Sequence, residues 1–225
     1  MKTSIKMCGL STREAVERAS SLGAARAGFI FFPKSPRHVT VTLAAELAAL
    51  ARYVGLQTVA VTVNADAEYL EQILGGMKPD MLQLHGAETV EQVRVIKSRY
   101  GLPVIKAFAI RETADLDAVK PYIGVADLFL FDAKPPKGSE LPGGNGVSFD
   151  WRLLGALDPG VNYMLSGGLT KDNVGAALEL TGAAAVDVSS GIERAPGIKD
   201  LDMMDSFVQA IRTFEDNKHA TAGSA

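Results

Sequence analysis

The 225-residue sequence contains one cysteine, one tryptophan and three histidines. A single cysteine cannot form an intramolecular disulfide, which favours a reducing compartment such as the cytoplasm. With 23 basic and 26 acidic residues, the chain lacks the basic excess of a nucleic-acid-binding surface. It also lacks the roughly 18-residue apolar run of a membrane span and the apolar stretch of a secretory signal. We therefore expect a cytoplasmic protein with neither a nucleic-acid nor a membrane partner.

Several ligand-binding patterns are also missing. No group of His, Cys, Asp and Glu has metal-ligand spacing, so we expect no metal site. The glycine-rich segments do not match the P-loop pattern G-x-x-x-x-G-K-[ST], which argues against a nucleoside triphosphate. Cys8-Gly9-Leu10-Ser11, after the first strand-like run, does not match the dinucleotide pattern G-x-G-x-x-G.

What is present is an ordinary globular composition, 47% hydrophobic and 22% charged, arranged as alternating strand-like and helix-like runs. The strand-like runs are short and apolar, as expected for strands buried on both faces. They cover residues 4–9, 27–32, 58–63, 81–84, 104–108, 127–131, 162–165 and 184–188. Helical spacing or composition follows at 11–22, 41–53, 66–74, 89–99, 114–119, 149–157, 172–180 and 201–214, with Thr170 expected to cap the seventh of these helices.

Strict alternation of strand and helix requires parallel strands with right-handed crossovers. Eight such units within this length favour a single-domain α/β protein, a (β/α)8 TIM barrel, over residues 1–215. An open doubly wound sheet is the structural alternative, but it should carry a dinucleotide pattern after the first strand. Residues 216–225 are small and polar, and we expect them to form a flexible C-terminal tail.

Two residues that can transfer protons stand at the ends of strand-like runs, Cys8 after the first and Asp132 after the sixth. In a parallel barrel the carboxyl ends of the strands form the active-site face, so the two side chains would converge. A thiol and a carboxyl group there can act as general base and general acid. Taken alone, Cys8 would more often be a small buried hydrophobe, and Asp132 a helix cap or loop hydrogen-bond partner.

Further polar residues follow the same pattern. Gln83 and His85 share a face at the end of the fourth strand, and Asp187 and Ser189 at the end of the eighth. Polar groups in buried strands are unfavourable unless they are paired or used, so several at one end of several strands indicate a site. We expect Gln83, His85 and Asp187 to contact substrate.

Lys6 shares a face with Cys8 and would lie below it in the barrel. The first and eighth strands become neighbours when a barrel closes, which makes Asp187 the expected partner of Lys6. Such a pair would have to form, because an isolated buried ammonium is very unfavourable.

Small residues dominate the loops after the seventh and eighth strands, Ser166-Gly167-Gly168-Leu169-Thr170 and Ser189-Ser190-Gly191. Each cluster alone would usually mark a tight turn. Many barrels, however, bind phosphate with these two loops and a helix N-terminus, because small residues let backbone N–H groups approach an anion. Gly143-Gly144-Asn145-Gly146 could add a further backbone wall. We predict a phosphate site formed by Gly144, Gly146, Gly167, Gly168, Ser189, Ser190 and Gly191.

Two other loops have features of a binding site. The segment after the second strand, residues 31–39, is stiffened by Pro33 and Pro36, and its Arg37 could present a planar fork to a carboxylate. A solvated arginine is the ordinary alternative, and His38 is expected at the surface. Residues 134–146 form a Pro/Gly-rich loop that is too long for a simple connection, and such loops are usually functional or disordered.

Taken together, these segments resemble the phosphoribosylanthranilate isomerase family from position 5 to about position 200. The matching segments, in order, are 6–9 (KMCG), 28–37 (GFIFFPKSPR), 83–86 (QLHG), 131–132 (FD), 143–146 (GGNG) with 149–151 (FDW), 166–169 (SGGL) with 173–174 (NV), and 186–193 (VDVSSGIE). Two residues depart from the family's usual pattern: Asn145 stands where threonine is usual, and Ser166 where alanine is usual. Neither departure removes a reactive group.

The resemblance implies an isomerase of tryptophan biosynthesis. Its substrate would be a phosphorylated aminosugar, N-(5-phosphoribosyl)anthranilate, which an Amadori rearrangement converts to 1-(2-carboxyphenylamino)-1-deoxyribulose 5-phosphate without a cofactor. It also implies that Cys8 is the general base, Asp132 the general acid and Arg37 the contact for the anthranilate carboxylate. We expect a monomer or a homodimer, between which the sequence does not decide.

Three other functions are the alternatives to this one. A sugar-phosphate epimerase commonly uses metal ligands that this sequence lacks, and indole-glycerol-phosphate synthase requires further acidic and lysine groups. A silent phosphosugar-binding protein would not need the pair of Cys8 and Asp132.

Overall fold

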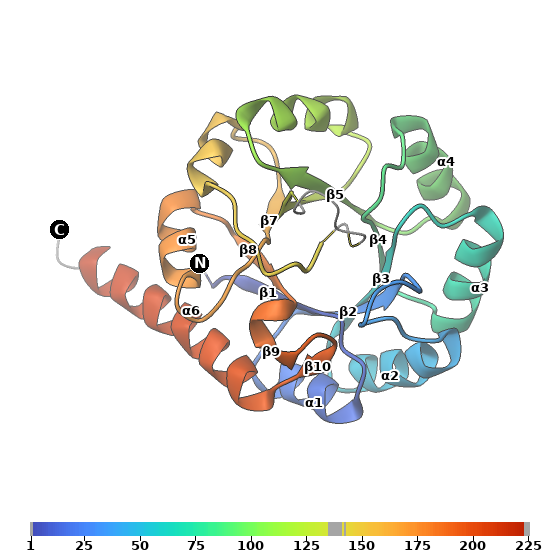
Figure 1. Ribbon diagram of the computed structural model, residues 1–225, viewed down its shortest axis with the longest axis horizontal. Coiled ribbons are helices and arrows are strands. Elements are labelled where there is room, and N and C mark those ends of the chain that lie inside the picture. Colours follow the sequence, from blue (N-terminus) through green and yellow to red (C-terminus); the bar gives the residue numbers. More distant parts are fainter. Residues whose placement is uncertain (1, 135–140, 142, 223–225) are drawn as a thin grey trace.

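Eight parallel strands form a closed barrel in the computed structural model, which describes residues 2–134, 141 and 143–222 (Figure 1). Neighbours in the chain are neighbours in the sheet, and the last strand pairs with the first. The strands are β1 (Ser4–Cys8), β2 (Arg26–Phe31), β3 (Gln57–Thr62), β4 (Met81–Leu84), β5 (Val104–Ile110), β6 (Leu128–Ala133), β7 (Tyr163–Leu165) and β8 (Ala185–Val188). The predicted (β/α)8 barrel is therefore confirmed.

Helices surround the barrel on all sides in Figure 1. Six are α-helices: α1 (Arg13–Ser21), α2 (Val41–Tyr53), α3 (Ala67–Met77), α4 (Val90–Tyr100), α5 (Val174–Thr181) and α6 (Leu201–Ala222). The first four begin after a residue whose side-chain oxygen accepts the N–H three positions on, namely Thr12, Thr40, Asp66 and Thr89. These side chains satisfy backbone donors that the first helical turn leaves without partners.

Two predicted helices are tighter 3₁₀ helices, η1 (Thr113–Tyr122) and η2 (Trp151–Ala156). Pro121 lies inside η1 and provides no N–H for an α-helical bond. Thr170 does not cap α5, contrary to the prediction: Asn173 is the capping position, and the Thr170 hydroxyl accepts the N–H of Asp172 in the preceding turn.

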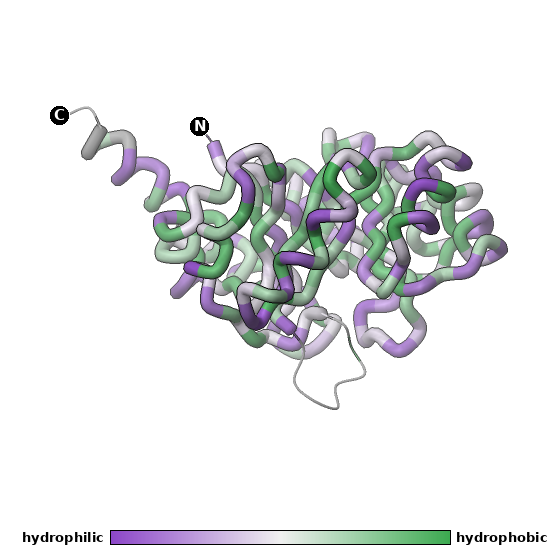
Figure 2. Tube along the Cα trace, turned by 90° about the horizontal axis from the view of Figure 1, so that it is seen from above, coloured by the Kyte–Doolittle hydropathy of each residue, from purple (hydrophilic) through white to green (hydrophobic). Residues whose placement is uncertain are grey.

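The last helix continues beyond the expected boundary at residue 215. α6 runs to Ala222, and its final turns project past the barrel wall (Figures 1 and 2). Asp216, Asn217 and Lys218 are exposed, so these polar side chains face solvent from a helix. A flexible tail from residue 216 stays a prediction. Within the described residues, no helix is long and apolar enough to cross a membrane.

A short hairpin that the sequence analysis did not predict follows the eighth strand. It consists of β9 (Glu193–Ala195) and β10 (Ile198–Lys199), preceded by the 3₁₀ turn η3 (Ser190–Ile192). Gly197 has a φ of +82° at its turn, and a Cβ there would press on the Pro36 backbone. The hairpin thus packs on the loop after β2.

The middle of the barrel interior is apolar, and polar side chains lie at the carboxyl ends of the strands. Val59, Val61, Ile105, Leu130 and Met164 belong to the cluster that fills it. A second, larger cluster lies between the strands and the surrounding helices. Since side chains alternate along each strand, the polar residues of the same inward faces come to the carboxyl end of the barrel.

Candidate active site

A cavity of about 670 Å³, including the open space at its mouth, lies at the carboxyl ends of the strands. Most of the residues predicted to form the site contribute to its wall: Cys8, Arg37, Gln83, His85, Asp132, Gly144, Gly167, Gly168, Asp187, Ser189 and Ser190.

Two of the predicted phosphate-binding glycines do not line this cavity, Gly146 and Gly191. Gly191 packs so closely against the backbone oxygen of Leu169 that a Cβ would overlap it. Glycine at this position therefore allows the loops after β7 and β8 to approach each other closely. Of the loop at 134–146, residues 135–140 and 142 lie outside the described residues.

Cys8 lies above a buried ion pair. The Lys6 ammonium is 2.8 Å from the Asp187 carboxylate, and the two residues are in register on β1 and β8, as predicted. Burial acts against the charged form of Lys6, but the Asp187 carboxylate outweighs it and raises the Lys6 pKa. The ammonium is therefore charged, with Cys8 as a near neighbour.

Gly28 on β2 shows how closely the thiol and the ammonium approach each other. A Cβ at this position would lie 3.0 Å from Cys8 Sγ and 3.1 Å from Lys6 Nζ. Burial raises the pKa of the Cys8 thiol, and the Lys6 ammonium only partly offsets this effect. The thiol is thus protonated at rest, beside a cation that favours its thiolate.

Asp132 presents one carboxyl oxygen to the cavity. Its Oδ1 accepts the N–H of Ala133 at 2.8 Å, which fixes the orientation of the group. Its Oδ2 is 3.5 Å from Nε2 of His85, a distance at which a direct hydrogen bond is weak. Oδ2 is therefore the oxygen available to a ligand.

His85 is oriented from below by Gln83, on the same face of β4. The Gln83 amide nitrogen lies 2.9 Å from His85 Nδ1. With the amide donating, Nδ1 is the acceptor, and a neutral ring then carries its proton on Nε2, toward Asp132.

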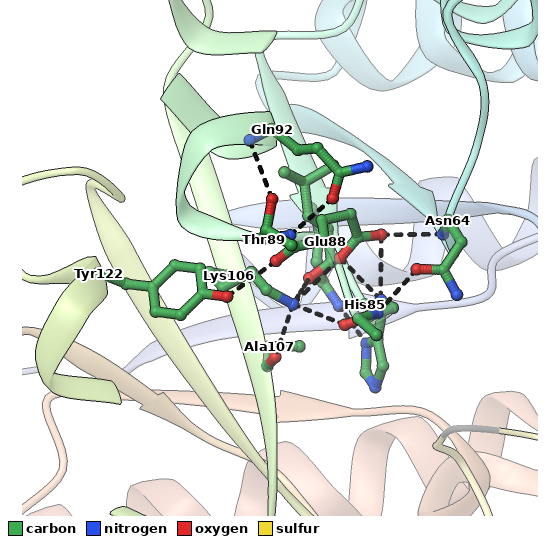
Figure 3. Close-up of polar contacts among 12 residues, drawn as sticks. Asn64, His85, Glu88, Thr89, Gln92, Lys106, Ala107 and Tyr122 are labelled. Carbon is green, nitrogen blue, oxygen red and sulfur yellow. Dashed lines mark hydrogen bonds and ion pairs between the residues drawn. The ribbon is translucent and has the colours of Figure 1, made fainter. Parts of the chain in front are cut away.

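The loop that carries His85 is fixed by a buried network shown in Figure 3. The Lys106 ammonium donates to the backbone oxygens of Leu84, Gly86 and Ala107, and it lies 3.0 Å from the Glu88 carboxylate. Glu88 in turn accepts the N–H groups of Asn64 and Gly86. Backbone on both sides of His85 is therefore bonded to one lysine.

Arg37 is buried, and its fork is already occupied. Its Nε and Nη2 each donate to Glu193 at 2.8 Å, and Nη2 also donates to the Gly144 oxygen at 3.2 Å. The edge formed by Nε and Nη2 therefore faces Glu193, and the expected contact with a ligand's carboxylate stays a prediction that Nη1 would have to fulfil. His38 is half-buried rather than fully at the surface, and it pairs with Ile30 in an isolated bridge.

Glu193 and Lys199, which were not predicted as site residues, form an ion pair beside Arg37. Lys199 Nζ lies 2.8 Å from Glu193 Oε1 and 2.9 Å from the Ser189 backbone oxygen. The Ser189 hydroxyl donates to the Cys8 oxygen at 3.1 Å. Glu193 lies in the matching segment 186–193. Of its two partners, Arg37 is distant in sequence, and Lys199 lies on the hairpin of β9 and β10, which was not predicted. An acidic residue just after the predicted phosphate loop was the only available signal.

The loops after β7 and β8 lie side by side at the wall of the cavity. Gly167 and Gly168 have φ values of +89° and +62°, and a Cβ on Gly168 would press on the backbone of Val147. Lys199 Nζ is 3.3 Å from the Ser189 hydroxyl, which places one positive charge behind the loop. Within the described part of the chain, no group of three or more His, Cys, Asp and Glu could hold a metal ion.

Comparisons with known proteins agree on one family. The family model described as N-(5'-phosphoribosyl)anthranilate isomerase matches residues 5–210. The N-(5'-phosphoribosyl)anthranilate isomerase of Sinorhizobium fredii is 61% identical over 215 residues, covering 96% of both chains. That of Brucella canis is 60% identical, covering 94% of this chain and 95% of its own.

Solved structures give the same result. Phosphoribosylanthranilate isomerase from Thermotoga maritima is 32% identical, with a TM-score of 0.83, and covers 94% of this chain and 99% of its own. Another, at 29% identity and a TM-score of 0.81 with the same coverage, is a complex with reduced 1-(o-carboxyphenylamino)-1-deoxyribulose 5-phosphate. The chain therefore belongs to the N-(5'-phosphoribosyl)anthranilate isomerase family, the isomerases of tryptophan biosynthesis.

Proposed function

We propose that this isomerase rearranges N-(5-phosphoribosyl)anthranilate with Asp132 as general acid and Cys8 as general base. The observation that carries the proposal is that both side chains belong to the wall of one cavity at the carboxyl end of the barrel. Both groups can transfer protons, and the reaction requires one proton to be given and another to be removed.

In the first step, protonated Asp132 donates its proton to the ring oxygen of the furanose. The C1–O bond breaks, and the substrate nitrogen supplies electrons to form an iminium. Oδ1 is held by the Ala133 N–H, so the transferred proton comes from Oδ2. The His85 Nε2, 3.5 Å away, stabilises the carboxylate that results.

In the second step, the Cys8 thiolate removes the C2 proton, which the iminium has made acidic. The electron pair of the C2–H bond forms the enolamine, which tautomerises to the ketone, so the net reaction consumes no proton. The positive charge of the iminium and of Lys6 favours the thiolate, against the burial that raises its pKa. The substrate nitrogen is the electron sink, so the chemistry needs no cofactor.

We assign the carboxylate and the phosphate of the substrate to the two ends of the cavity. Arg37 would contact the anthranilate carboxylate through Nη1, since its other nitrogens hold Glu193 and Gly144. The phosphate would bind the loops after β7 and β8 at Gly167, Gly168, Ser189 and Ser190, with Gly144 and Asp187 at the wall. Gln83 supports His85. Gly191 would contribute by allowing these two loops to approach each other closely, and Gly146 as part of the loop after β6.

The test follows the fluorescence of N-(5-phosphoribosyl)anthranilate, generated in situ, for the wild type and the Cys8→Ser and Asp132→Asn variants. We expect each substitution to lower kcat by about 100-fold or more, the usual scale for an acid–base group. Asp127→Asn is the matched control, because Asp127 precedes the opposite end of the same strand and binds Lys97. Undiminished turnover in both active-site variants would refute the assignment.

We further propose a cytoplasmic location, supported by the single cysteine. We also propose that the chain is a monomer or a homodimer. Light scattering of the purified chain distinguishes them.

A further inference from the structure

The guanidinium of Arg37 already holds one carboxylate of the protein itself. Glu193 binds it through two parallel hydrogen bonds of 2.8 Å, and the Arg37 and Glu193 side chains are only 4% and 3% exposed. Such a bidentate pair fixes the plane of the guanidinium as well as its position. Within the described chain, Nη1 is the one nitrogen of this group without a recorded partner.

Glu193 is itself held from the other side. Lys199 lies 2.8 Å from Oε1, and the Gly197 N–H donates to Oε2 at 3.2 Å. Burial acts to raise the pKa of Glu193, but the hydrogen bond from Arg37 and the charge of Lys199 outweigh it and lower that pKa. Glu193 is therefore a charged carboxylate at neutral pH, with both oxygens in use.

Glu193 lies between two basic side chains, Arg37 and Lys199. Burial lowers the pKa of Lys199, and the neighbouring Glu193 carboxylate only partly offsets this effect. A buried ion pair alone is weak evidence for a gain in stability. Here the pair includes Arg37, which lines the cavity and is proposed to contact the substrate carboxylate.

We propose that Glu193 is a positioning residue for carboxylate recognition. Glu193 binds the edge of the Arg37 guanidinium that Nε and Nη2 form. Nη1 is then the only nitrogen that the substrate's carboxylate can reach. This rests on the role proposed above for Arg37. Without Glu193, the long arginine side chain is free to change rotamer, and the unoccupied fork no longer has a fixed direction.

The experiment compares two substrates, N-(5-phosphoribosyl)anthranilate and N-(5-phosphoribosyl)aniline, which lacks only the carboxylate. Product formation is measured for the wild type and the Arg37→Met and Glu193→Gln variants. In Glu193→Gln we expect kcat/KM for the carboxylate substrate to fall by roughly tenfold or more, mainly through KM, the scale of one charge-assisted hydrogen bond. The aniline compound should be converted at a nearly unchanged rate.

A double-mutant cycle shows whether Glu193 acts through Arg37. In an Arg37→Met background, Glu193→Gln should cause no further loss of selectivity between the two substrates. The matched control is Glu215→Gln, because Glu215 is also a buried, ion-paired glutamate but binds Arg212 and the Thr3 N–H at the other end of the barrel. Its selectivity should equal that of the wild type.

An equal loss on both substrates, or no loss on either, would overturn the inference and leave Glu193 a structural residue. If Glu193→Gln does not fold, Glu193→Asp makes the same comparison, since a shorter carboxylate cannot reach both nitrogens. Selectivity lost in Arg37→Met but retained in the Glu193 variant would overturn this inference alone. Selectivity retained in Arg37→Met would overturn the proposed role of Arg37 as well.

Discussion

Lys6 and Asp187 occupy paired positions on β1 and β8, and their side chains form a 2.8 Å ion pair inside the barrel, next to Cys8. This ion pair links β8, the last strand of the barrel, to β1, the first. It also places a fixed positive charge beside the thiol.

Replacing Lys6 by Met should destabilise the protein strongly. Asp187 would be left as a buried carboxylate without its cation, and breaking a buried pair in this way lowers the free energy of unfolding by about 3–5 kcal/mol. Denaturant unfolding of the variant measures this loss. The double variant Lys6→Met, Asp187→Leu should recover most of it, because neither charge remains. Equal stability of Lys6→Met and the wild type would show that the pair does not matter to the fold.

The thiol of Cys8 should titrate above the value of about 8.5 for a free cysteine, because its burial raises the pKa. It is the only cysteine, so the ultraviolet absorbance of thiolate reports this group alone. A general base works as thiolate, and its fraction grows as pH rises toward that pKa. Wherever removal of the C2 proton limits turnover, kcat/KM should rise with pH over this range, whereas Asp132→Asn, limited by ring opening, should not show this rise. A titration midpoint below that of free cysteine would contradict the account.

Gly28→Ala should displace the thiol. The added Cβ would stand 3.0 Å from Cys8 Sγ and 3.1 Å from Lys6 Nζ, and overpacking of this kind lowers the free energy of unfolding by about 1–3 kcal/mol. We also expect kcat to fall, since Cys8 Sγ must move. Gly75→Ala is the control: in α3 nothing lies within 4 Å of the new Cβ, and alanine there should stabilise by about 0.4–1 kcal/mol. If both variants behave alike, the tight contact at Gly28 is not real.

Lys106→Met should loosen the loop that carries His85. Glu88 would become an unpaired buried charge, so the free energy of unfolding should drop by about 3–5 kcal/mol. Thermal unfolding and kcat are the two readouts. The same substitution at Lys97, whose ion pair with Asp127 is more than a third exposed, should change stability by no more than about 1 kcal/mol. Comparable losses in the two variants would argue against a special role for the buried network.

Local patterns in the sequence predict most of the fold. Apolar runs indicate the strands, and the threonine and aspartate caps begin four helices at the expected places. Errors occur where a local rule competes with packing. Thr170 bonds within a turn instead of capping α5, and α6 continues past Phe214 although its residues become polar. Helix propensity and solvent-facing polar side chains are enough to extend a helix already anchored to the barrel.

The site could be predicted in part, for a geometric reason. Cys8, His85 and Asp132 end parallel strands, and closure of the barrel alone brings such ends together. The partner of Lys6 also follows from closure. The engagement of Arg37 by Glu193 could not be foreseen, because it depends on the hairpin of β9 and β10, which has no periodic signal and whose contacts are long-range.

In the proposed mechanism, Asp132 opens the sugar ring and Cys8 then removes the C2 proton. Substrate deuterated at C2 separates the two roles, because only the second step breaks that bond. In Cys8→Ser, proton removal becomes limiting, so deuterium should slow the residual turnover clearly relative to unlabelled substrate. In Asp132→Asn, ring opening becomes limiting, and the two substrates should react at nearly the same rate. The opposite pattern, or an equal isotope effect in both variants, would contradict the assignment.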